Sequence, residues 1–161
     1  MQRLSLATIV ALILFGSGCS TFSSSSANSS QLVAADNAKV LEVEATGQPH
    51  DYTFTVTVRS PDTGCDRYAD WWEVITPDGE LLYRRILLHS HVDEQPFTRT
   101  GGTVAIAPQQ EVIIRVHMSV DGYSPQAQQG TINSGFSEVT LPPDFATTLA
   151  DVEPLPTGCS F

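Results

Sequence analysis

Basic residues are scarce in this sequence. Eight Lys and Arg stand against eighteen Asp and Glu, which gives a formal net charge of −10 at pH 7, and Lys39 is the single lysine. Proteins that bind nucleic acid or anionic lipid electrostatically concentrate Lys and Arg on one face. We therefore predict that the chain binds no nucleic acid and does not dock on anionic lipid through its charge.

Helical and catalytic patterns are also absent. Outside the first 18 residues, no segment repeats apolar residues every three to four positions, as an amphipathic helix would. The sequence has no Cys-x-x-Cys pair, no Gly-x-Ser-x-Gly elbow and no phosphate-binding glycine loop. Ser90 lies between two histidines, but a nucleophile and its base must meet in space, and this pattern does not place them together. We predict that the protein is not an enzyme and needs no cofactor.

Residues 1–18 have the pattern of an export signal. One positive charge, Arg3, precedes an apolar run from Leu6 to Phe15, which is too short to span a bilayer as a permanent helix. Small residues follow this run and lead to Cys19. The segment is therefore predicted to direct export and then to be removed.

Small residues that end at a cysteine resemble the lipobox of bacterial lipoproteins. Ser17 and Gly18 match the small positions of that motif, whereas Gly16 stands where the family prefers leucine. The resemblance implies cleavage before Cys19, acyl chains on its sulfur and its amine, and permanent attachment to a membrane of the cell envelope. In a source with two membranes, Ser20 resembles the outer-membrane class. The alternatives are ordinary secretion and a membrane anchor.

Residues 19–37 separate the signal from the rest of the chain. They are rich in serine, including the run Ser23 to Ser26, and contain little that can pack into a core. Such a segment is predicted to be a flexible tether with a reach of roughly 20 to 25 Å. One domain, residues 38–161, follows it.

From Lys39 onward, apolar and polar residues alternate with the period of two that indicates half-buried strands. Residues 119–133 are polar and are predicted to form a long mobile loop, residues 97–102 a connector, and the chain from Pro142 an extended tail. Seven strands are predicted, at residues 39–45, 52–59, 68–76, 80–91, 103–107, 111–120 and 134–141.

Seven short strands without helices are typical of an antiparallel β-sandwich, and the spacing resembles the immunoglobulin-like type. A tryptophan of the third strand would fill the core between the sheets. The cysteines are not placed for the usual bridge between the two sheets, so the resemblance is one of architecture. The predicted class is all-β, and a fold by itself assigns no function.

Cys65 and Cys159 are predicted to form a disulfide. With Cys19 assigned to lipid, they are the remaining pair in an oxidising compartment. The bond would fasten the proline-rich tail to the loop after the second strand. Closing so long a separation stabilises a fold by roughly 4 to 5 kcal/mol in the chain-entropy model.

Two of the four histidines form a candidate metal site. His89 and His91 are two positions apart on a predicted strand, so both imidazoles point to one side, as Cu²⁺ or Zn²⁺ would require. His117 and Glu94 are further candidate ligands. Because a lone His-x-His pair has no third ligand at a typical spacing, a copper or zinc site is the alternative and not the main prediction.

Strand alternation predicts an unusual outer face on one sheet. If Trp72 fills the core, the third, fourth and sixth strands share an outer face that combines apolar side chains with arginines and histidines. An exposed apolar patch of this kind marks a binding surface unless something covers it. The predicted face contains Trp71, Glu73, Ile75, Tyr83, Arg85, Leu87, His89, His91, Ile113, Arg115 and His117.

Two interpretations of this face remain open. In the first, Trp71, Tyr83, Arg85, Leu87 and Arg115 bind a protein partner or a small ligand. In the second, the tail of residues 141–161 lies across the face, and Glu73, Arg85 and Arg115 of the face pair with one another across strands. The sequence thus predicts a lipid-anchored envelope protein that acts as a binding or structural module, with metal binding as the alternative.

Overall fold

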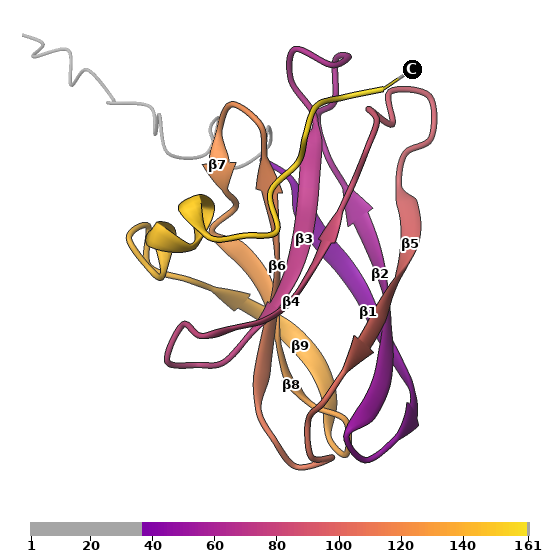
Figure 1. The fold of residues 1–161 in the computed structure, drawn as a ribbon, viewed down its shortest axis with the longest axis vertical. Coiled ribbons are helices and arrows are strands. Elements are labelled where there is room, and N and C mark those ends of the chain that lie inside the picture. Colours follow the sequence, from indigo (N-terminus) through magenta and orange to yellow (C-terminus); the bar gives the residue numbers. More distant parts are fainter. Residues whose placement is uncertain (1–36, 161) are drawn as a thin grey trace, which may run out of the picture.

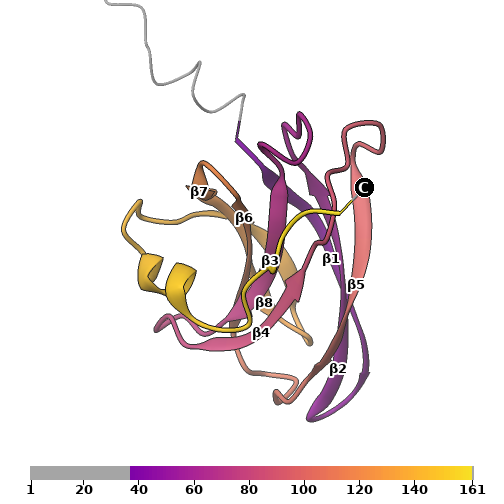
Figure 2. The same cartoon turned by 45° about the horizontal axis from the view of Figure 1, so that its top comes forward.

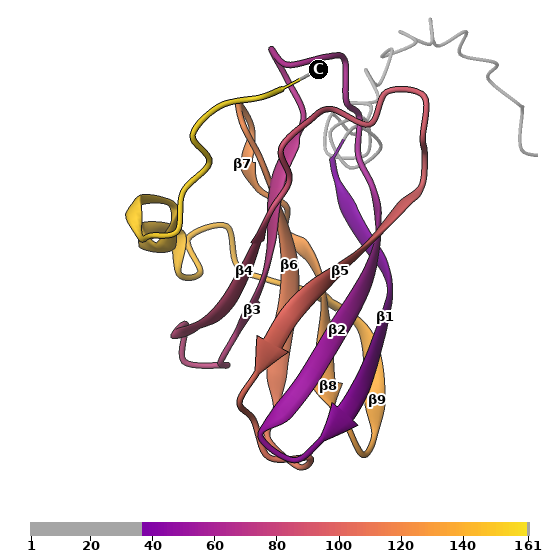
Figure 3. The ribbon, with the colours of Figure 1, turned by 45° about the vertical axis from the view of Figure 1, so that its right-hand side comes forward.

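The computed structural model describes residues 37–160 as an all-β sandwich of two antiparallel sheets (Figure 1). The smaller sheet has the order β1-β2-β5 and the larger β4-β3-β6-β8-β9, with β7 paired to β6. Figure 3 shows the sheets as two layers. The two antiparallel sheets form a β-sandwich, as predicted, but with nine strands instead of about seven. The strands are β1 (Lys39–Gln48), β2 (Asp51–Arg59), β3 (Ala69–Ile75), β4 (Leu81–Ile86), β5 (Phe97–Val104), β6 (Val112–Met118), β7 (Gly122–Tyr123), β8 (Gln126–Thr131) and β9 (Gly135–Thr140).

The predicted export signal, Cys19 and the tether as far as Asp36 lie outside the described residues. Within residues 37–160, the helical structure is a short 3₁₀ turn, η1 (Thr147–Asp151). No helix in this part of the chain has both the length and the apolar character needed to cross a membrane.

The main core lies between the two sheets. The alternation predicted for β2 is confirmed, because Tyr52, Phe54, Val56 and Val58 are all buried. Trp72 of β3 is also fully buried in this core. In addition, every residue of β3 and of β6 is buried. Since side chains of a strand alternate between faces, the larger sheet must be covered on both sides.

The prediction of a mobile loop at residues 119–133 is wrong. This segment contains β7 and β8, and β8 lies inside the larger sheet between β6 and β9. Two of its amide side chains are buried and bond to β1: Gln126 and Gln128 both donate to the carbonyl of Val40, at 3.0 and 3.2 Å. Because satisfied polar groups take the place of apolar ones here, the strand shows no hydrophobic alternation.

The connector predicted at residues 97–102 is also a strand, the first part of β5. Gly101 and Gly102 suggest a turn in the sequence, but in the fold they leave room for aromatic rings. A Cβ on Gly101 would lie 2.7 Å from atoms of both Trp72 and Tyr83. The backbone N–H of Gly102 donates to the Tyr83 hydroxyl at 2.6 Å. Here the absence of side chains on β5 allows the sandwich to close against β4.

Residues 141–160, hereafter the strap, cover the outer face of the larger sheet. Figure 2 shows the strap and η1 on the side of β3 and β4 that faces away from β1 and β2. Leu141 and Leu149 pack with Ile75 and Ile113 in a second apolar cluster, separate from the main core. The predicted disulfide between Cys65 and Cys159 is confirmed, with Cα atoms 5.5 Å apart, and it fastens the end of the strap to the β2–β3 loop.

Candidate functional site

The outer face of the larger sheet is covered, which is the second of the two interpretations. Trp71 and Arg115 lie on this face as predicted, but they are only 3% and 1% exposed. The strap supplies the cover, so these two residues do not form an open binding surface. A broad apolar sheet face is stabilised when it is removed from water, and the strap achieves this within the same chain.

A buried carboxylate, Glu73, lies at the centre of the covered face between two arginines. It accepts hydrogen bonds from Arg84 Nη2 at 2.6 Å and Nε at 2.9 Å, and from Arg115 Nε at 2.8 Å. The side chains of all three are at most 1% exposed. Charges buried to this degree require such partners, because each has lost its contact with water. The cross-strand partner on β4 is therefore Arg84 and not Arg85.

The alternation predicted for β4 is wrong by one residue. In the β3–β4 ladder, Val74 pairs with Tyr83, whereas the next residue, Ile75, pairs with Leu81. Leu82 is thus an extra residue, and a bulge of this kind moves all later side chains to the opposite face. The residues assigned to the wrong face for this reason are Tyr83, Arg85 and Leu87.

These three residues lie on the inner side of the larger sheet. Tyr83 and Leu87 pack in or against the main core. Arg85 donates from Nε to the Thr100 carbonyl at 3.2 Å and from Nη1 to the Ile86 carbonyl at 3.2 Å. It therefore helps to close the edge between β4 and β5. The strand itself ends at Ile86, before the two histidines.

His117 lies on the covered face and is not grouped with the other histidines. Its ring stacks on Trp71 with centroids 3.7 Å apart, and Tyr123 meets it edge-on at 4.7 Å. Its Nδ1 lies 2.7 Å from Asp70 Oδ1. His117 is thus a packed part of the covered face, and the structure does not bring it to His89 and His91 as a third ligand.

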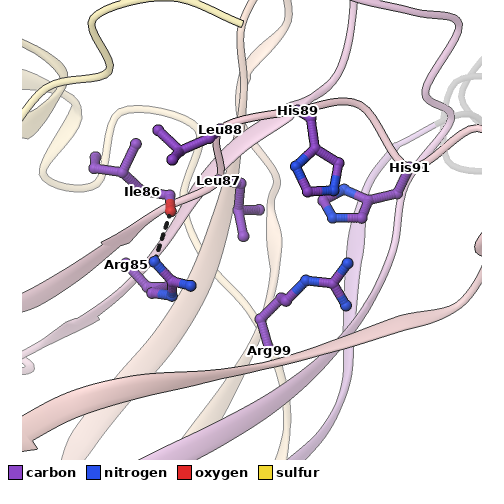
Figure 4. A pocket seen from close by; sticks show the side chains of 7 residues that line it. All are labelled: Arg85, Ile86, Leu87, Leu88, His89, His91 and Arg99. Atoms are coloured by element: carbon purple, nitrogen blue, oxygen red, sulfur yellow. Dashed lines mark hydrogen bonds between the residues drawn. The ribbon is translucent and has the colours of Figure 1, made fainter. Parts of the chain in front are cut away.

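His89 and His91 do come together, in the loop that follows β4 (Figure 4). Their ring centroids are 4.6 Å apart. His91 is only 3% exposed, and its ring stacks on Phe97 with centroids 3.8 Å apart. Among the described residues, neither ring nitrogen of His91 has a hydrogen-bond partner. We call this region, which includes Arg85 and Arg99, the histidine corner.

A buried carboxylate that the sequence analysis missed holds the histidine corner in place. Asp62 accepts hydrogen bonds from the backbone N–H groups of His91 and Ala69, at 2.8 and 3.0 Å, and from the Ser60 hydroxyl at 2.6 Å. Its Oδ2 is 3.8 Å from His91 Nδ1, which is beyond hydrogen-bonding distance. An Asp after Ser-Pro in a loop was the available signal, because Asp commonly bonds nearby backbone in turns.

Two cavities meet at the histidine pair. The smaller, about 80 Å³, is lined by both histidines, by Arg85 and Arg99, and by residues 86–88 (Figure 4). The larger, about 380 Å³, is lined by residues 89–94 together with Gly64 and Ser160. A ligand at this corner would therefore meet both imidazoles from either cavity.

Charge at the corner is partly paired. Arg99 donates from its two Nη atoms to the two oxygens of Glu94 at 3.0 and 2.7 Å, and the hydrogen bond lowers the pKa of Glu94. The pKa of His91 is lowered by burial and, to a smaller extent, by the positive charges of Arg99 and His89. His91 is therefore neutral at pH 7. In this form a ring nitrogen has a free lone pair that can accept a hydrogen bond or bind a metal.

The predicted metal ligands are not assembled as a set. Glu94 is held by Arg99, and His117 lies on the covered face. Across residues 37–160, no group of three or more His, Cys, Asp or Glu side chains is arranged to hold a metal ion. What remains of the predicted site is the His89–His91 pair.

Comparison with known proteins finds one similar sequence to report. A protein of Halomicrobium mukohataei, described as "Putative lipoprotein", is 42% identical to this chain over 82 residues. The matched stretch covers 51% of this chain and 40% of that protein, so the chain spans less than half of its relative. No family model matches the chain. No solved structure matches it either.

Proposed function

We propose that this chain is a lipid-anchored protein of the cell envelope whose β-sandwich is a binding module. The anchor is Cys19, whose surroundings resemble a lipobox. The description of the similar Halomicrobium protein as "Putative lipoprotein" supports this assignment. In a source with two membranes, Ser20 favours the outer one.

The site for an external ligand is the histidine corner, because the chain's own strap already fills the covered face. The observation that carries this assignment is His91, a buried imidazole that borders two cavities and has no partner for either ring nitrogen among residues 37–160. A buried polar group without a hydrogen bond costs about 1 to 3 kcal/mol. A ligand, or a side chain of a protein partner, that bonds to His91 removes this cost.

The corner is also held ready for binding. Asp62 fixes the backbone of His91, and Phe97 supports its ring. The end of the strap reaches the same corner, where the backbone N–H of Ser160 donates to the Leu88 carbonyl at 2.6 Å. A site that needs little reorganisation loses little entropy when a ligand binds.

A photo-cross-linking experiment in whole cells tests this site. A photoreactive side chain is placed at Leu88, which is 52% exposed beside the corner, or at Val120, which is 66% exposed elsewhere. We expect a specific adduct at position 88, lost when His91→Ala is added, and no such adduct at position 120. The same adducts at both positions, or none at either, would refute a binding site at the corner.

Transition-metal binding is the second candidate function, with Cu²⁺ or Zn²⁺ as the metal. It is favoured by the two imidazoles with centroids 4.6 Å apart and by the neutral state of His91. A bound metal would take His89 and His91 as ligands, with water or other small ligands completing its coordination.

Calorimetric titration of the detergent-solubilised protein with Cu²⁺ and with Zn²⁺ tests the metal candidate. Binding should be lost in the double variant His89→Ala and His91→Ala and retained in the control His50→Ala, whose imidazole lies on the exposed β1–β2 turn. Affinity no tighter than about millimolar, or equal binding by the double variant and the control, would refute metal binding at the histidine pair.

Cell fractionation tests the anchor. The variant Cys19→Ser should leave the membrane fraction, whereas Cys65→Ser should remain in it, because only the first removes the lipidated residue. If Cys19→Ser stayed with the membranes, lipidation at this position would be refuted.

A further inference from the structure

On the covered outer face, the contacts that orient the two buried arginines are made by residues of the larger sheet itself. The arginines and the residues that orient them come from β3, β4, β6 and β7, and the strap contributes none of them. The carboxylate of Glu73 orients both guanidinium groups, while rings flank them: Arg84 lies 4.5 Å from the Trp71 ring and Arg115 lies 3.5 Å from the Tyr123 ring. Donors fixed in this way need no rearrangement to bind a chain laid over them.

The two arginines bind the strap mainly through its backbone, and Arg115 also lies over the Phe145 ring, 5.9 Å from its centroid. Arg84 donates to the carbonyl of Leu149 at 2.7 Å and also to the carbonyls of residues 152 and 154, at 2.5 and 3.1 Å. Arg115 donates to the carbonyls of Phe145 and Ala146 at 2.7 and 2.9 Å. Five carbonyl contacts from two side chains are a mode of recognition that any suitably shaped peptide backbone can satisfy.

Apolar contacts supply the sequence preference. Leu149 is 9% exposed and packs with Ile75 and Ile113, whereas its neighbour Thr148 is exposed. Within the described residues, the strap forms no β-ladder with either sheet. The strap therefore binds as a peptide ligand does, through an apolar anchor and backbone hydrogen bonds, and not as another strand of the fold.

We propose that this face is a peptide-binding site for the strap sequence. Its own strap fills the site within the chain, and the strap of a second copy fills it by exchange. The same atoms make the contacts in both arrangements. The chain's own strap is favoured over that of a second copy, because β9 and the Cys65–Cys159 bond hold its two ends near the site and so raise its effective concentration. This proposal is independent of ligand binding at the histidine corner.

A cleavable protein tests the peptide site without relying on a truncated chain to fold. A protease recognition sequence replaces the exposed residues 142–144 of the full chain, which is cut after folding and then reduced with dithiothreitol. We expect the strap to leave on dilution or to exchange with a labelled synthetic peptide of residues 144–160. Binding should be saturable, and the near-ultraviolet circular dichroism of the sandwich should persist.

Two peptide variants provide the matched comparison. Leu149→Asp in the peptide should weaken binding about tenfold or more, because it places a charge in the apolar cluster, whereas Thr148→Asp should bind like the original. Absence of exchange, equal binding by the two variants, or loss of the circular dichroism signal as the strap leaves would each overturn the peptide site.

Exchange between copies is tested with two full-length variants, Cys65→Ser and Cys159→Ser, mixed and oxidised with glutathione disulfide, which accepts the two electrons of the two thiols. An exchanged strap should join Cys159 of one copy to Cys65 of the other, as peptide mapping will show. Leu149→Asp in the Cys65→Ser chain should reduce the yield, and Thr148→Asp should not. No joined pair, or a yield insensitive to Leu149→Asp, would overturn exchange.

Discussion

Glu73 on β3 and Arg84 on β4 form an ion pair with 2.6 Å between Oε2 and Nη2, and both side chains are completely buried. This pair connects the sheet to its cover, because the same guanidinium also donates to the carbonyl of Leu149 in the strap. A surface ion pair contributes little to stability, whereas a broken buried pair leaves an uncompensated charge.

Replacement of Glu73 should therefore be strongly destabilising. We expect Glu73→Gln to lower the free energy of unfolding by about 3 to 5 kcal/mol, because Arg84 and Arg115 remain buried without a countercharge. The control is Glu94→Gln, which breaks the surface pair with Arg99 and should cost about 1 kcal/mol or less. Urea denaturation measures both. Equal costs for the two variants would show that burial of the Glu73 pair has no special effect.

A methyl group added to Gly101 should also destabilise the fold. Its Cβ would lie 2.7 Å from atoms of Trp72 and Tyr83, so Gly101→Ala should cost about 1 to 3 kcal/mol by overpacking. Gly102→Ala, whose Cβ would lie 3.3 Å from Tyr83, should cost less. Thermal unfolding compares the two. A smaller effect at Gly101 than at Gly102 would contradict the close approach of the rings to β5.

Stability should fall on mild acidification because of His91. Burial lowers its pKa in the folded state, while in the unfolded chain an imidazole titrates near 6.5. At a pH between the folded and unfolded pKa values, the imidazole is protonated in the unfolded chain but not in the folded one. The free energy of unfolding therefore decreases as pH drops below about 6.5. His91→Phe should lose less stability than the wild type between about pH 7.5 and 5.5. Identical pH profiles for the two proteins in metal-free buffer would contradict this assignment.

Tyr123 should ionise late in an alkaline titration. Burial and the nearby charge of Glu73 raise its pKa to about 12, from a usual value of 10.0. Because the pKa of Tyr123 is higher in the folded state than in the unfolded chain, the neutral side chain contributes to stability below pH 10. This contribution is lost as pH rises toward 12. Tyrosinate absorbance should show a transition near pH 12 that Tyr123→Phe removes. An unchanged transition near pH 12 in Tyr123→Phe would assign it to another tyrosine, such as Tyr68, whose pKa burial also raises.

Much of the fold was predictable because strands that face a core on one side alternate in sequence. β2 shows this directly, and the burial of Trp72 followed from the same rule on β3. β8 was missed because two of its three buried residues are glutamines whose amides bond to Val40, and satisfied polar groups carry no hydrophobic pattern. Gly101 was misread because room for a ring and freedom to turn both favour glycine.

The candidate site was predictable only in part. The His-x-His spacing correctly predicted that His89 and His91 lie close together, and the count of cysteines correctly predicted the disulfide. The bulge at Leu82 reversed the faces of Tyr83 and Arg85, and the sequence gives no sign of a single extra residue in a ladder. The role of Asp62 at the histidine corner was missed because its partner there, the backbone N–H of His91, is 29 residues away in sequence.

The sequence by itself determined the properties that depend on composition and local pattern: the resemblance to a lipoprotein signal, the all-β class, the pairing of Cys65 with Cys159, and an apolar sheet face that is either a binding surface or covered. Those properties depend on local patterns and on counts. Only the tertiary structure decided that the strap covers this face and that, among residues 37–160, both ring nitrogens of His91 are buried without a hydrogen-bond partner. Both depend on contacts between segments far apart in the chain, whose positions are fixed only when the two sheets, the loops and the strap pack together.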